Sequence, residues 1–224
     1  MNFSELEKRL ACIATVMTAN LFFPNSNYPP LRSNVIRIVR VPTAPVPIYA
    51  AHVPFELITV NCAENRPWQY TQQVAHEFGH LSTRADKRYP RQDGNMWIEE
   101  AICGAYSIYA IRAMSEAEGP LKDGAQDYLY NCLNDYRSDE VDADWFARHL
   151  AEFRTAATLT MPLMKLSGYI AARLPVGQVI ADNRAIMDNP LNEDHRAYLS
   201  DWKKRCNGPL TIPALLESLG KHAP

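Results

Sequence analysis

The sequence lacks three features that would each place the protein in a special class. It has no run of about 18 consecutive apolar residues, so we expect no membrane-spanning helix. It has no surplus of basic residues, because 23 Lys and Arg face 25 Asp and Glu for a formal net charge of −2, and this argues against binding to nucleic acid. Its five cysteines include no Cys-x-x-Cys pair, which favours free thiols in a reducing compartment.

What is present is the composition of an ordinary globular protein, with 47% hydrophobic and 21% charged residues. A length of 224 residues allows one large domain or two small ones, and we expect a single domain over residues 1–224. The stretch Ala11 to Phe23 is moderately apolar, but Glu5 and Glu7 precede it and Asn20 interrupts it, which does not fit a signal peptide. We therefore expect a soluble, cytoplasmic protein without a nucleic-acid or membrane partner; its oligomeric state stays open.

The N-terminal third predicts one helix followed by a small sheet. Apolar residues recur every three or four positions from Phe3 to Leu21, which is the spacing of an amphipathic helix. The β-branched segments Val35 to Val41 and Phe55 to Asn61 predict two strands. Between them, Ile48 to Val53 follows several prolines and is at best an edge strand.

The remaining chain predicts helices. Pro67 suits the first turn of a helix that continues to about Arg84, and a second helix is expected from Met96 to Met114. Later helices include one for which Ser138 is the expected N-cap. The fold class we predict is α+β, in which residues 1–66 form a helix and a small sheet and residues 67–224 are mainly helical.

The helix that begins at Pro67 carries the motif His76-Glu77-Phe78-Gly79-His80. Two histidines four residues apart lie on one helical face, with Cβ atoms about 5 to 6 Å apart, so their ring nitrogens can bind one zinc ion. Glu77 lies about 100° around the helix from His76 and can act as a general base toward a water molecule. The alternative is a histidine pair without a metal, and a third ligand decides between the two.

The best candidate for that third ligand is Glu100 on the next predicted helix. A third histidine directly after the motif is absent, because residues 81–86 contain neither the glycine nor the histidine of a metzincin. His149 and His195 are distant in sequence. Nineteen residues separate His80 from Glu100, enough for the chain to leave one helix and return beside it.

These residues resemble the gluzincin metallopeptidases, whose pattern is His-Glu-x-x-His followed after about eighteen or nineteen residues by a Glu. The resemblance covers Val74 to Tyr109 and includes a Trp-x-x-Glu-Ala setting. The matching residues are His76, Glu77, His80, Trp97, Glu100 and Ala101. The resemblance implies a zincin-like fold, a Zn²⁺ cofactor bound by His76, His80 and Glu100, and peptide hydrolysis with Glu77 as the catalytic base.

Three points bear on the details of this site. Glu99 competes with Glu100, but successive residues lie about 100° apart, and Glu100 fits the Trp-x-x-Glu spacing. Gly104 stands where thermolysin-like enzymes have an acidic residue that orients the first histidine, so the partner of His76 is not identified. For the oxyanion donor, Tyr169 is the first choice, ahead of Tyr106, Tyr130 and His195.

The function we predict is a cytoplasmic zinc metallopeptidase that acts on a peptide or protein substrate. Its substrate could pair with the strand Phe55 to Asn61, which directly precedes the metal-binding helix. Two alternatives remain open: an inactive zinc-binding interaction module of the same fold, and a metal-free helical interaction protein. The sequence does not identify the substrate, or decide between endopeptidase and exopeptidase activity.

Overall fold

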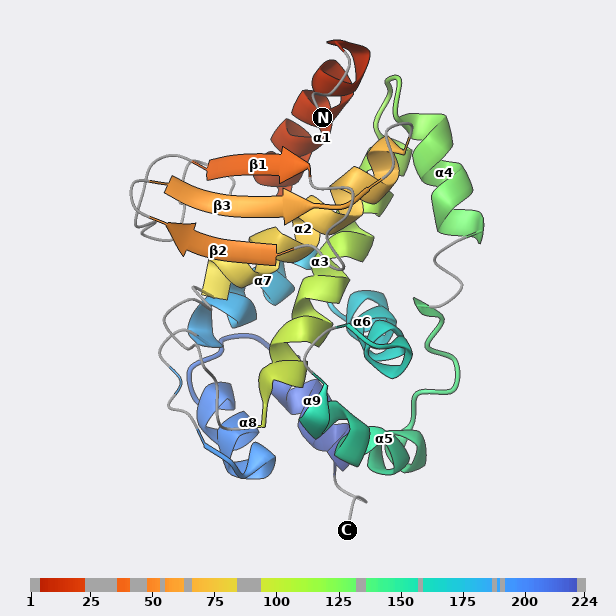
Figure 1. Ribbon diagram of the computed structural model, residues 1–224. Coiled ribbons are helices and arrows are strands. Elements are labelled where there is room, and N and C mark those ends of the chain that lie inside the picture. Colours follow the sequence, from red (N-terminus) through yellow and green to blue (C-terminus); the bar gives the residue numbers. More distant parts are fainter. Residues whose placement is uncertain are drawn as a thin grey trace. The chain divides into compact units, whose positions relative to one another are not determined.

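The computed structural model describes residues 5–22, 36–40, 48–52, 55–62, 66–83, 94–131, 136–156, 159–186, 189 and 192–220, to which all structural statements below refer. The chain divides into two compact units. Met1–Ser82 and Tyr106–Asn134 form unit 1, and Thr83–Ala105 and Asp135–Pro224 form unit 2. Helix α3 (Met96–Glu116) is continuous and contributes its N-terminal half to unit 2 and its C-terminal half to unit 1 (Figure 1).

The described residues are mostly helical, so the prediction of an α+β, zincin-like fold is wrong at the level of fold class. They form nine helices, whereas the strands number three and each contains five or six residues. The β-branched segments are too short and too few to form more than one small sheet. The helical spacing that begins at Pro67 instead continues through nearly all of the later described chain. Whether the whole chain is one domain stays a prediction.

Unit 1 contains the sheet, whose strands are β1 (Ile36–Arg40), β2 (Ile48–His52) and β3 (Phe55–Val60). Their order is β1-β3-β2, with β1 parallel and β2 antiparallel to β3. The two expected strands, β1 and β3, are therefore confirmed, and the segment expected to be at best an edge strand forms β2 at an edge of the sheet. The proposed pairing of β3 with a substrate is wrong, because β3 is the central strand and already has a partner on each side.

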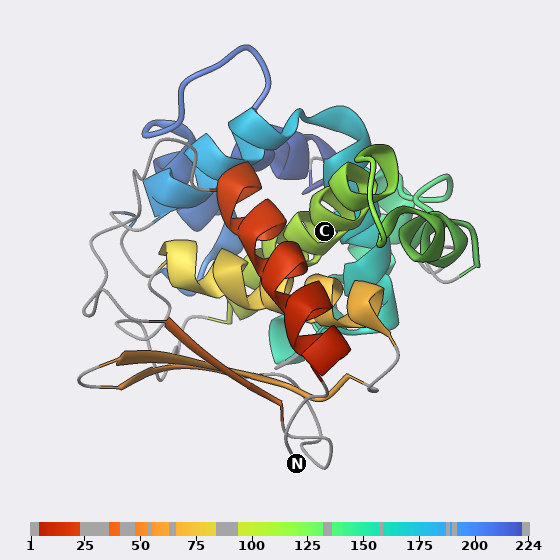
Figure 2. The ribbon, with the colours of Figure 1, turned by 90° about the horizontal axis from the view of Figure 1, so that it is seen from above.

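Two helices of unit 1 lie on the same side of this sheet, α1 (Glu5–Phe22) and α2 (Pro67–Thr83) (Figure 2). Both were expected from the helical spacing, and α2 begins at Pro67, which lacks a backbone N–H and needs no partner there. The hydroxyl groups of Thr15 on α1 and Tyr70 on α2 form a hydrogen bond of 2.9 Å. Burial raises the pKa of Tyr70 to about 12. Residues 23–35, between α1 and β1, and residues 84–93, which follow α2, lie outside the described residues.

The C-terminal half of α3 and helix α4 (Lys122–Asn131) complete unit 1 and pack on α2. Gln72 connects both of them to α2. Its backbone carbonyl accepts a hydrogen bond of 2.8 Å from Ser107 on α3, and its side-chain oxygen accepts one from the hydroxyl of Tyr128 on α4. Gly124 of α4 lies against the ring of Trp68, where a Cβ atom would come within 2.5 Å of the indole. Helix α2 is thus held by side chains from two neighbouring helices.

Unit 2 consists of helices around an aromatic and aliphatic core. Besides the N-terminal half of α3 it contains α5 (Ala143–Thr155), α6 (Met161–Arg173), α7 (Val176–Ala185), α8 (His195–Lys203) and α9 (Ile212–Gly220). Trp97 of α3 is fully buried and stacks on Phe153 of α5, with 5.4 Å between the ring centroids. Asp182 of α7 is also buried, and its carboxylate accepts a hydrogen bond of 2.7 Å from the N–H of Ile212 at the start of α9.

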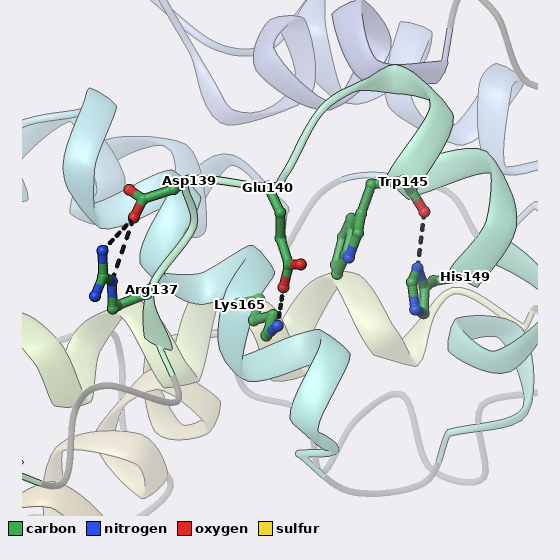
Figure 3. A network of polar contacts seen from close by, with 6 residues as sticks. All are labelled: Arg137, Asp139, Glu140, Trp145, His149 and Lys165. Carbon is green, nitrogen blue, oxygen red and sulfur yellow. Dashed lines mark hydrogen bonds and ion pairs between the residues drawn. The ribbon is translucent and has the colours of Figure 1, made fainter.

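The acidic segment before α5, whose ion pairs are drawn in Figure 3, has a different N-cap from the predicted one. The N-cap of α5 is Asp142, whose carboxylate accepts a hydrogen bond of 2.7 Å from the N–H of Trp145; the prediction of Ser138 is wrong. Ser138 instead lies one turn earlier, where its carbonyl accepts a bond from the N–H of Val141. The next two acidic residues form ion pairs, Asp139 with Arg137 and Glu140 with Lys165.

Candidate metal centre

The motif that begins at His76 lies entirely within α2. The rings of His76 and His80 meet edge to face, with centroids 5.0 Å apart. His80 is buried, His76 is half-buried, and Glu77 between them is only 3% exposed. Helix α2 therefore presents two histidines on one face with a buried carboxyl group beside them, as the sequence predicts.

A third side chain that can bind metal belongs to the same cluster. Among the described residues, His76, His80 and Cys103 form a group whose potential ligand atoms all lie within 4.8 Å of one another. Atoms bound to one zinc ion lie about 3.3 to 3.8 Å apart, given bonds of about 2.0 to 2.3 Å at tetrahedral angles. Two imidazoles with a thiolate are donors that zinc prefers. The residues present thus fit a zinc ion.

The two glutamates considered as third ligands are both buried on α3, with Glu99 1% and Glu100 4% exposed. Neither belongs to the group formed with Cys103, and the assignment of Glu100 stays a prediction. Sequence reasoning did not consider Cys103 as a ligand. The signal was nevertheless available, because Cys103 follows Glu99 by four residues and Glu100 by three, which places it within about 60° of both around the helix.

Contacts within unit 1 show which side of α3 faces α2. Ser107 donates a hydrogen bond to the carbonyl of Gln72, and the sulfur of Met114 lies 3.9 Å from the hydroxyl of Thr71. Ser107 and Met114 are seven residues apart, so they point in directions only about 20° different. Glu100 lies seven residues before Ser107 and continues this stripe, whereas Glu99 lies about 80° away from it.

Gly104 departs from the pattern of thermolysin-like enzymes for a reason visible in unit 2. A Cβ atom at Gly104 would come within 2.2 Å of the Ser167 Oγ and within 3.2 Å of Leu159. This close approach of α3 to α6 leaves no room for an acidic side chain. The residue that would orient His76 therefore cannot come from position 104.

The candidate oxyanion donors have different surroundings. Tyr169 of α6 is buried, and the guanidinium of Arg173 lies over its ring at 3.5 Å. His195, at the start of α8, is buried, and burial is the main cause that lowers its pKa. Tyr106 is fully buried, whereas Tyr130 is 80% exposed. None of these contacts tests a role as oxyanion donor, and that role stays a prediction.

Two further observations concern the class of the protein. None of the described helices combines the length and the apolar character needed to cross a membrane. Comparison of the chain with protein-family models, with curated proteins and with solved structures found no match.

Proposed function

We propose that the protein is a zinc-dependent metallopeptidase of gluzincin type, which hydrolyses peptide bonds in the cytoplasm. The observation that carries this proposal is the arrangement on α2, where His76 and His80 meet at 5.0 Å beside the buried Glu77. A buried carboxyl group next to two histidines is the arrangement that a general base beside a bound metal requires. The absence of Cys-x-x-Cys pairs supports the cytoplasmic compartment.

Glu100 is the third zinc ligand in this proposal. Its support is the stripe of α3 that includes Ser107 and Met114, both of which contact α2. A stripe with seven-residue spacing continues along the same side of a helix, so Glu100 projects toward the side that bears those contacts. Cys103 lies three residues further along this side and is a fourth potential donor.

The catalytic steps fall to this chain's own residues. When bound, zinc would acidify water and polarise the scissile carbonyl group. The Glu77 carboxylate accepts a proton from the attacking water and delivers it to the nitrogen of the leaving amine. The water oxygen forms the new bond to the carbonyl carbon as the carbon–nitrogen bond breaks, so the products are a carboxylic acid and an amine.

A zinc-binding protein without activity is the second candidate function, and Cys103 is the observation in its favour. Catalytic zinc sites keep one position open for water, whereas structural sites are closed by four protein ligands. If His76, His80, Glu100 and Cys103 all bind the ion, the site is closed. Replacement of Cys103 would then leave zinc bound and would open a position for water.

Metal analysis of the purified protein tests the proposal. We expect about one zinc per chain, and His80→Ala should abolish binding because it removes one of few ligands. His149→Ala is the matched control, since the His149 ring packs against Trp145 in unit 2 with centroids 4.4 Å apart, and His149 belongs to no candidate metal group among the described residues. A wild-type protein that takes up no transition metal from zinc-replete, chelator-free medium would refute the function. A zinc-loaded protein that cleaves nothing in a mixed peptide library would favour the inactive binder.

A further inference from the structure

The metal-binding helix is connected to the central strand of the sheet by a pair of side-chain amides. Strand β3 ends at Val60, and the next residue, Asn61, bonds to Gln73 of α2. The N–H of Asn61 donates to Gln73 Oε1 at 2.8 Å, and Gln73 Nε2 donates to Asn61 Oδ1 at 2.6 Å. The Gln73 amide thus bonds both the backbone and the side chain of the residue that follows β3.

Gln73 lies on the face of α2 that carries the proposed metal site. It precedes His76 by three residues, Glu77 by four and His80 by seven, and all these spacings place side chains on one side of a helix. A bond at Gln73 therefore acts on the same face that must point at the ion. All four residues and Asn61 belong to unit 1.

Two bonds in a fixed relative geometry restrain the rotation of α2 about its own axis. Side-chain tips lie about 5 to 6 Å from the axis of a helix, so a rotation of about 10° moves them by about 1 Å. Functional sites need their ligands held within about 0.5 Å of the productive position. A single bond would let the helix roll about that contact, whereas a paired amide resists the roll.

We propose that Gln73 and Asn61 are a positioning pair, which sets the rotation of α2 and so the direction of His76, Glu77 and His80. The proposal rests on the zinc site proposed above. Neither residue touches the ion. The neighbouring Gln72 has a different task, because its bonds to Ser107 and Tyr128 secure α3 and α4 rather than the sheet.

Charge-changing variants separate positioning from a simple electrostatic effect. In Gln73→Glu, the new carboxylate still accepts from the Asn61 N–H and, after a flip of the Asn61 amide, from its NH₂ group. In Asn61→Asp, the new carboxylate still accepts from Gln73 Nε2. The double variant sets two carboxylates against each other and loses the second bond. Electrostatics alone predicts tighter zinc binding in the double variant, because it adds the most negative charge near a cation.

The experiment measures zinc affinity by competition with a chromophoric chelator, and the visible absorption spectrum of the Co²⁺-substituted protein. We expect each single variant to stay within about threefold of the wild type, and the double variant to bind zinc at least about tenfold more weakly with an altered Co²⁺ spectrum. Gln73→Leu adds no charge and removes the amide, so its zinc affinity should fall as far as that of the double variant. It also provides the test if the double variant does not fold. Asn20→Asp on α1 is the control for charge alone, because Asn20 is an exposed residue of unit 1.

The outcomes separate this proposal from the function on which it rests. If the wild type binds zinc, and the double variant and Gln73→Leu bind it equally tightly or more tightly, the positioning pair is refuted. The metal site itself then stands. A wild-type protein without zinc refutes the function and the positioning pair together. Folding is checked in metal-free buffer by circular dichroism, so that a loss of affinity is compared only among folded proteins.

Discussion

Gly104 of α3 lies so close to Ser167 of α6 that a Cβ atom on the glycine would come within 2.2 Å of the serine Oγ. The hydroxyl of Ser167 is itself held in place, because it donates a hydrogen bond of 2.8 Å to the carbonyl of Leu163. Neither partner can move far in this buried contact. The glycine is therefore required by packing in unit 2, four residues after Glu100.

Replacement of Gly104 by alanine should destabilise the protein. Alanine is the better helix former, but the added methyl group overlaps Ser167, and such overpacking costs about 1 to 3 kcal/mol of the free energy of unfolding. Gly177→Ala in the first turn of α7 is the control, because nothing lies within 4 Å of its Cβ position. We expect Gly177→Ala to be neutral or to stabilise by up to about 1 kcal/mol. Denaturant unfolding measures both variants, and equal stabilities would contradict the packing argument.

The sequence predicted those elements that have a clear period. The helical spacing located α1, α2 and α3 to within a few residues, and the β-branched segments located β1 and β3. The prediction of the α5 N-cap was wrong because Ser138 and Asp142 are both good caps, and only the bond to the N–H of Trp145 selects Asp142. Sequence patterns describe short-range preferences, and two equal preferences leave the choice to the rest of the fold.

The candidate site was predictable only in part for the same reason. His76, Glu77 and His80 share one helix, so their spacing alone defines their relative positions. The pairing of Gln73 with Asn61 was not predicted, because a strand end and a helix face meet only in the folded chain. The central position of β3 likewise depends on strand order, which the strand segments do not encode individually. For this reason the prediction that a substrate pairs with β3 was wrong, although the prediction of the strand itself was correct.

Glu100 and Glu99 should respond differently to replacement. Glu100→Ala removes the proposed ligand and should weaken zinc binding, whereas Glu99→Ala should leave it within a few fold, because the two side chains point about 100° apart. The measurement is zinc affinity at equal protein concentration. Release of zinc by Glu99→Ala with retention by Glu100→Ala would invert the assignment. Cys103→Ser in the same series shows whether the thiol contributes as well.

Cys206 should be a slowly reacting thiol. Burial raises its pKa to about 12, and the Asp182 carboxylate beside it acts in the same direction. Only the thiolate is alkylated, so at pH 8 about one Cys206 side chain in 10⁴ is reactive. Iodoacetamide should therefore modify the exposed Cys12 well before Cys206. Asp182→Asn removes the negative charge, lowers the pKa of Cys206 and should speed its alkylation. Mass spectrometry of the labelled peptides measures both rates, and equal rates in wild type and variant would contradict the role of Asp182.

Glu77→Gln should abolish peptide hydrolysis while zinc stays bound. The amide has nearly the shape of the carboxyl group and fits the same buried position, but it cannot accept the proton of the attacking water. General acid–base catalysis contributes about 10² to 10⁴-fold, which corresponds to roughly 2.7 to 5.4 kcal/mol of activation free energy. Hydrolysis of a mixed peptide library and zinc content are measured for both proteins. Full activity in the zinc-loaded variant would assign the proton transfer to another group, although His76 and His80 would remain the metal ligands.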